Sequence, residues 1–291
     1  MQKITGWSVV RQSVALMWRC RIAVLGFLVV QIVLGMAYGV LGLNDPRVVR
    51  GNLDAVGMGG IIAGSFLFGV VGAGLYLLYT HYMVTALRGE PVLVPERPVL
   101  RLLRMLWTGI KIGLTFMLLM GAASLPIIGL AVSMPGLRDV PAAVFAVGVG
   151  GFAVLFSLLI LFLRLELAMP GVVAGDGTTL REAWRLSRGR SWRMFASVLW
   201  LMLLCIVLAF VVALPCFLIF GSTQGPVFVQ VVAVSNAVPS LLGVTLFCVW
   251  YVRLADDADA DGVGAGPQQA APRVENLAQK IGGYYGPDAR D

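Results

Sequence analysis

Residues 179–195 read TLREAWRLSRGRSWRMF and place five arginines within thirteen residues, between two long apolar runs. Thr179 and Glu182 have the spacing of a capping box, in which each side chain bonds the backbone N–H of the other residue. Gly189 is typical of a position just past the end of a helix. The stretch therefore predicts a short helix that starts after Thr179 and stops by Gly189.

The two faces of this predicted helix differ in polarity. On one face lie Leu180, Ala183, Trp184 and Ser187, and on the other lie Arg181, Arg185 and Arg188. Such a helix is typical of a segment in the headgroup plane of a membrane, with tryptophan toward lipid and arginine toward water. Arg190, Trp192 and Arg193 then lead into the next apolar run. We expect these residues to contact anionic headgroups, each arginine contributing about 1 kcal/mol.

The chain as a whole is too apolar for a water-soluble protein. Of its 291 residues, 59% are hydrophobic and 13% are charged, and the mean hydropathy is +0.88. Six runs are long enough to cross a ~30 Å hydrocarbon core as helices. They lie near 22–43, 55–80, 108–134, 141–163, 194–220 and 226–252. We therefore expect an all-α, polytopic membrane helix bundle with six transmembrane helices.

Lysine and arginine alternate between the two ends of these runs. Segments 1–21, 81–111 and 164–193 are basic, whereas the intervening loops carry little net charge. The positive-inside rule then places both termini in the cytoplasm. Residues 1–253 are expected to form the transmembrane domain, and the Gly-, Pro- and Asp-rich residues 254–291 a disordered cytoplasmic tail. The net charge of +7 lies beside membrane segments, so we expect no nucleic-acid partner.

The basic segments share a layout. Arg97, Arg101 and Arg104 precede Trp107 with the same i, i+4, i+7 spacing with which Arg181, Arg185 and Arg188 precede Trp192. The pattern suggests three units, each a cytoplasmic interfacial helix followed by a transmembrane hairpin. Basic loops with interfacial tryptophan also arise in any chain that obeys the positive-inside rule. Both interpretations stay open.

The sequence RLELAMPGVVAGDGTTLREAWRLSRGRSWRMF resembles the signature region of the bacterial glycerophosphoryl diester phosphodiesterase membrane-domain family and its YciC-like relatives. The resemblance is carried by Arg164, Pro170, Ala183, Ser187, Gly189, Trp192 and Arg193, with Tyr251 and Arg253 near the last run. The family's usual leucine spacing before the glycine is not kept. The resemblance implies a six-helix, multi-pass protein of the bacterial cytoplasmic (inner) membrane, without the separate barrel domain that carries phosphodiesterase activity.

Residues suited to catalysis or metal binding are sparse. The only histidine, His81, lies among tyrosines at a run end, and Glu166 is the acid nearest to a run. The four cysteines form no C-x-x-C pair, which argues against a metal site. The DADADG stretch at 257–262 is followed by Gln268 where a calcium loop needs glutamate. We expect no catalytic residue, no metal, no cofactor and no enzymatic activity.

Polar and kinking residues inside the runs leave two functions open. Pro126, Pro215 and Pro239 can kink their helices, and Asn236 can bond a carbonyl freed by Pro239. A cavity for a lipid could form where kinked helices separate, although kinks without function are commoner. We expect a non-enzymatic membrane-homeostasis or accessory factor that acts through contacts with anionic lipids or a membrane protein. The alternative is a transporter or exporter of an amphipathic, lipid-like solute; homo-oligomerisation also stays open.

Overall fold

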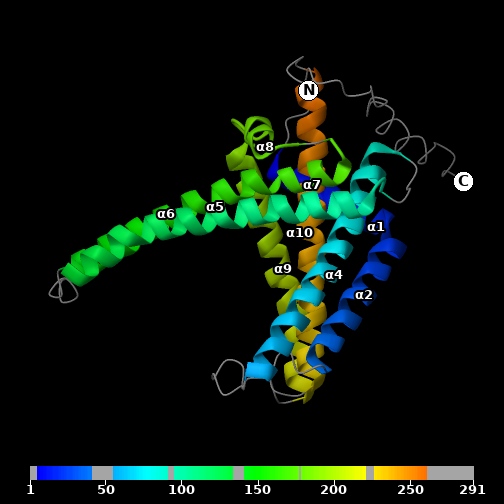
Figure 1. The fold of residues 1–291 in the computed structure, drawn as a ribbon, viewed down its shortest axis with the longest axis horizontal. Coiled ribbons are helices and arrows are strands. Elements are labelled where there is room, and N and C mark those ends of the chain that lie inside the picture. The colour runs from blue at the N-terminus through cyan, green and yellow to red at the C-terminus, as the bar shows by residue number, and fades with distance from the viewer. Residues whose placement is uncertain are drawn as a thin grey trace, which may run out of the picture.

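The computed structural model describes residues 5–40, 55–90, 95–133, 141–176, 178–220 and 226–260, and the regular structure within these ranges is helical. In chain order the helices are α1 (Gly6–Arg19), α2 (Arg21–Val40), α4 (Ala55–Arg88), α5 (Pro98–Ser133), α6 (Pro141–Glu166), α7 (Ala168–Ala174), α8 (Leu180–Leu186), α9 (Ser191–Phe220) and α10 (Pro226–Ala260). Figure 1 shows their arrangement.

The six predicted apolar runs all lie in long helices. Five helices, namely α4, α5, α6, α9 and α10, are each long and apolar enough to cross a membrane. Helix α2 passes the same test together with α1, from which it is bent by 87°. The bend falls at Cys20, which ends α1. The expectation of six apolar helices is therefore met by five spans, or by six when the bent pair counts as one.

The predicted interfacial helices have different outcomes. Helix α1 is separate from α2, and α8 is separated from α9 by a turn in which Gly189 has a φ of 77°. The three-unit interpretation, which had been left open, gave the basic stretch from Arg97 to Arg104 a helix of its own, and for this stretch that interpretation is wrong. This stretch is the start of α5, which runs unbroken to Ser133. Pro98 suits the first helical position, and neither proline nor glycine follows before the apolar run.

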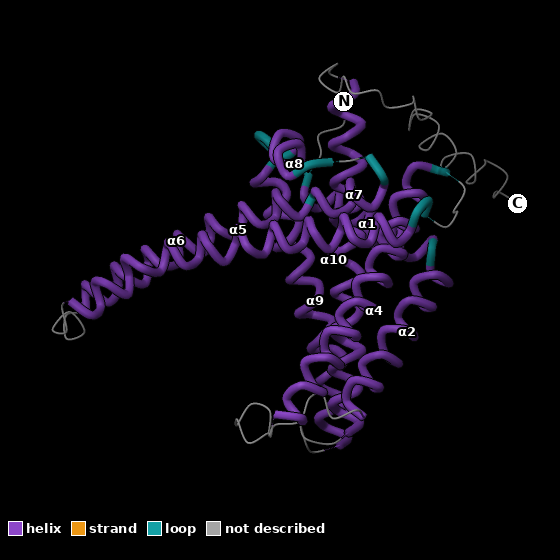
Figure 2. The backbone as a smooth tube through the Cα atoms, in the orientation of Figure 1, coloured by secondary structure: helices purple, strands orange, loops and turns teal. Residues whose placement is uncertain are grey.

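The sequence predicted that the long helices form one bundle, and the structure differs from that prediction. Helices α2, α4, α9 and α10 lie alongside one another, whereas α5 and α6 pair into an arm that projects away from them (Figures 1 and 2). Phe116 of α5 and Phe162 of α6 meet edge-to-face, with ring centroids 5.7 Å apart. The arm helices pack on each other and also contact α7 and neighbouring helices at their inner ends, while the bundle helices surround α10.

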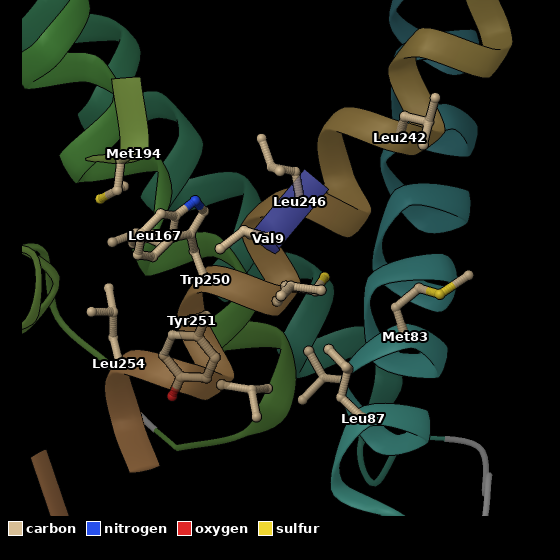
Figure 3. Close-up of a cluster of buried hydrophobic side chains, with 14 of the residues drawn as sticks. Val9, Met83, Leu87, Leu167, Met194, Leu242, Leu246, Trp250, Tyr251 and Leu254 are labelled. Carbon is tan, nitrogen blue, oxygen red and sulfur yellow. The ribbon is translucent and has the colours of Figure 1, made fainter. Parts of the chain in front are cut away.

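A hub joins the arm to the bundle; we define it as α1, α7, α8 and the adjoining ends of the long helices. Its core gathers buried side chains from six other helices around Leu246 and Trp250 of α10, and Figure 3 shows part of this cluster. Gly6 of α1 approaches α9 so closely that a Cβ would lie 2.9 Å from the Ser197 backbone nitrogen. The Trp250 indole donates a 2.8 Å hydrogen bond to the Ser197 hydroxyl. The hub is thus a packed junction.

The helix ends that meet at the hub are the basic ones. Arg88 closes α4, Arg101 lies in the first turn of α5, and Arg164 lies near the end of α6. Helix α10 reaches beyond the boundary expected at residue 253 and ends at Ala260, where Asp257 pairs with Arg190 at 2.5 Å. The first part of the expected tail is therefore helical. Residues 261–291 lie outside the described part of the chain.

Candidate functional site: a basic cleft at the start of α5

A cleft of about 620 Å³ opens between the first turns of α5 and the segment that joins α7 to α8. Its charged lining consists of Arg97, Arg101, Arg104, Lys111, Arg181 and the single carboxylate of Glu96. Its apolar lining includes Leu100, Trp107, Val172 and Leu180. Cations and apolar side chains therefore face the same space.

The α5 wall follows directly from the sequence. Arg97, Arg101, Arg104, Thr108 and Lys111 recur at intervals of four and three residues, which places them in one stripe along a helix. Arg97 has a left-handed φ of 51°, although non-glycine residues rarely adopt it. The residue before a proline is disfavoured in the right-handed helical region, and the Arg97 carbonyl still accepts the Arg101 N–H at 3.1 Å. Strained backbone of this kind clusters at functional sites.

The opposite wall begins where α7 ends. Gly175 has a φ of 90°, and a Cβ at this position would lie 2.9 Å from Nη2 of Arg101. Nη1 of Arg101 donates to the Val173 carbonyl at 2.9 Å. The guanidinium thus donates a hydrogen bond to a free carbonyl at the end of α7, where positive charge is favourable. Arg101 is consequently half-buried and joins the two walls.

A polar network fixes this wall from behind. The Asp176 carboxylate accepts from Arg88 Nη2 at 2.6 Å and from the Tyr251 hydroxyl at 2.5 Å. The Tyr251 hydroxyl also lies 3.1 Å from Oγ1 of Thr178. A Cβ on Gly171 would lie 2.2 Å from that Oγ1. Because Arg88 neutralises Asp176, this half-buried carboxylate adds little negative potential to the cleft.

Trp107 and Lys111 form the far end of the α5 wall. Trp107 is 58% exposed, and the Lys111 ammonium lies 5.3 Å from its ring centroid. Exposed tryptophan is typical of the boundary between headgroups and hydrocarbon. The cleft therefore has a strongly cationic end and an amphipathic end.

The structure gives different roles to the residues of the stretch 179–195. Its capping box is confirmed, since the Thr179 N–H donates to Glu182 Oε2 at 2.7 Å and the Glu182 N–H donates to Thr179 Oγ1 at 3.3 Å. The Arg164 guanidinium stacks 3.5 Å from the Trp184 ring centroid and donates to Ser187 Oγ at 2.9 Å. Ala183 and Ser187 face the core, while Trp184 keeps 42% of its surface exposed. Arg164 thus ties α8 to the end of α6.

Only part of the predicted headgroup-binding set reaches the cleft. Arg97, Arg101, Arg104, Trp107 and Arg181 line it, whereas Arg185, Arg188, Arg190, Trp192 and Arg193 do not. Arg190 pairs instead with Asp257, and the Trp192 ring lies 5.4 Å from the Phe195 ring. Glu96 and Lys111 were not among the predicted site residues. Lys111 could have been found by extending the arginine spacing of α5 by one heptad.

Of the four predicted cavity residues, the structure describes the side chains of two, Pro215 and Pro239. Pro215 lies inside α9 and is exposed, and Pro239 lies inside α10 and is half-buried. The side chains of Pro126 and Asn236 lie outside the described residues. A cavity at these helices therefore stays a prediction.

Comparisons with family models, with curated proteins and with solved structures found no match to this chain. Among the described residues, no group of three or more His, Cys, Asp or Glu side chains could hold a metal ion. What the long apolar helices establish is the class of protein: the chain is a multi-pass membrane protein.

Proposed function

We propose that this multi-pass protein binds the headgroup of an anionic phospholipid in the basic cleft and acts through that contact, as a membrane-homeostasis or accessory factor, without turning the lipid over. One observation carries the proposal: five cations and one carboxylate surround a cleft of about 620 Å³ that also has apolar walls. An excess of cations beside apolar side chains matches an amphiphile with a negative head.

The chemistry of the lining residues fits phosphate. Arginine presents planar, bidentate N–H donors to phosphate oxygens, whereas lysine acts as a point charge. Each such cation near an anionic membrane surface is worth about 1 kcal/mol, or roughly a fivefold change in affinity. Leu100 and Val172 offer apolar surface to the carbon atoms next to the phosphate.

The proposed setting is the cytoplasmic face of a bacterial inner membrane. The basic helix ends gather at the hub, and the positive-inside rule places such ends in the cytoplasm. Membership of the glycerophosphoryl diester phosphodiesterase membrane-domain family is likewise proposed, on the residues that carry the resemblance. The contact between Arg164 and Ser187 supports it, because it gives two residues of that pattern a shared structural role.

A lipid-binding measurement tests the proposal. The purified full-length chain in phosphatidylcholine nanodiscs is titrated with phosphatidylglycerol, and binding is followed by native mass spectrometry. We expect Arg104→Gln with Arg181→Gln to weaken binding about 25-fold, on a scale of roughly fivefold per cation. Arg193→Gln is the matched control, since Arg193 is exposed and lies outside the cleft. Equal affinity of all three proteins, or no preference over phosphatidylcholine, would refute the proposal.

A further inference from the structure

The cationic stripe of α5 is longer than one phosphate requires. Arg97 and Lys111 both line the cleft and lie fourteen positions apart, which is about 21 Å along a helix that rises 1.5 Å per residue. A charged N–H donor must come within roughly 2.7–2.9 Å of a phosphate oxygen. The two ends of the stripe therefore cannot close on the same phosphate, and Arg104 lies between them.

Lys111 is the residue that most needs an anion. It lies within the candidate membrane span Pro98–Leu125, one helical turn beyond Trp107. No carboxylate pairs with it in the part of the chain that the structure describes, and its recorded contact is with the Trp107 ring. Ionisable residues at membrane depth are costly and mark binding or transport sites. An anion brought in by a ligand would supply the missing countercharge.

We propose that the cleft takes a lipid with two phosphodiester groups separated by a short linker. One phosphate lies at the end marked by Arg97 and Arg101, and the other lies at the end marked by Arg104 and Lys111. The inference rests on the proposed function and narrows its ligand. A diphosphate, whose two phosphorus atoms share one oxygen, would occupy a single end and leave the other cations without a countercharge.

The test compares two lipids that differ in phosphate number. The full-length chain in phosphatidylcholine nanodiscs is titrated with phosphatidylglycerol, which has one phosphodiester, and with diphosphatidylglycerol, which has two, at equal phosphate concentration. We expect diphosphatidylglycerol to bind about fivefold more tightly or better. Lys111→Gln should remove that preference, so it should weaken diphosphatidylglycerol binding about fivefold more than it weakens phosphatidylglycerol binding. Arg193→Gln should retain the preference, and the unfolding temperature of each variant confirms that it is folded.

The outcomes separate the two proposals. Equal affinity for both lipids, with binding still lost in the Arg104 and Arg181 variant, overturns the two-phosphate inference and leaves the proposed function standing. Absence of binding to both lipids overturns the proposed function and this inference together. A prenyl diphosphate or inorganic pyrophosphate that displaces diphosphatidylglycerol at equal phosphate concentration overturns the inference, because adjacent or free phosphates would then suffice.

Discussion

Two basic stretches with the same arginine spacing have different surroundings in this molecule. Arg97, Arg101 and Arg104 begin a helix that continues into an apolar span, and all three line the cleft. Of the second stretch's three arginines, only Arg181 reaches that cleft, while Arg185 and Arg188 are exposed elsewhere. Identical periodicity thus places cations on one helix face in both cases, but the neighbouring segment decides whether that face encloses a site.

The largest expected effect comes from the wall that the two stretches share. Gly171→Ala places a methyl group 2.2 Å from Oγ1 of Thr178 and 2.9 Å from Tyr251 Cε2. Overpacking of this kind costs about 1–3 kcal/mol, and the displaced wall should also weaken lipid binding. Thermal unfolding in detergent measures the loss. Gly243→Ala, in α10, meets nothing within 4 Å and should be neutral or slightly stabilising; equal losses in both variants would contradict the tight approach.

Removal of two arginines from each basic stretch compares their contributions to lipid binding. Arg101→Gln with Arg104→Gln should weaken diphosphatidylglycerol binding about 25-fold, at roughly fivefold per cation. Arg185→Gln with Arg188→Gln should weaken it less than about twofold, because these exposed side chains lie away from the cleft. The measurement is the titration in nanodiscs described above. Similar losses in the two double variants would mean that α8 binds headgroups independently of the cleft.

The two ion pairs of the hub should differ in strength. Arg88→Gln leaves Asp176, whose side chain is 15% exposed, without its cation. We expect a loss of about 1–2 kcal/mol after allowance for solvent screening. Arg190→Gln breaks the more exposed pair with Asp257 and should cost less than about 1 kcal/mol. Denaturant unfolding of both variants checks the order, and a reversed order would show that burial does not control these pairs.

Loss of either capping box should have a smaller effect on stability than loss of the Arg88 ion pair. Thr179→Ala removes the cap of α8, and Thr5→Ala removes the cap of α1. Each should cost about 1 kcal/mol. Only the α8 change should also weaken lipid binding, by about twofold, because α8 carries Arg181 into the cleft. A change in binding from Thr5→Ala of the same size would place the lipid contact outside the cleft.

Much of the fold could be predicted because a membrane restricts the secondary structure that an apolar segment can adopt. Apolar runs of sufficient length must become helices, since hydrocarbon offers no partner for a free backbone group. The capping box at Thr179 and Glu182 was predictable because it depends on residues three positions apart. The continuity of Arg97–Arg104 with its span was missed because basic character suggested a separate interfacial helix. Nothing in that stretch breaks a helix.

Only one of the two walls of the candidate site, the α5 wall, was predictable from the sequence. Spacing along α5 indicates a cationic stripe, and the same rule would have added Lys111. The approach of Gly175 and Thr178 to that stripe joins segments more than sixty residues apart in the sequence. Local periodicity carries no information about such contacts, which depend on how α7 packs against α4 and α5.

The sequence by itself determined the class of the protein, the basic ends and the cap of α8, because composition, length and short-range spacing control these features. Only the tertiary structure decided that α5 and α6 leave the bundle as an arm, that the basic ends meet at one hub, and that Arg181 joins the α5 arginines while Arg185 and Arg188 do not. The physical reason is that a helix face specifies what it can bury or bind, whereas long-range packing selects its neighbour.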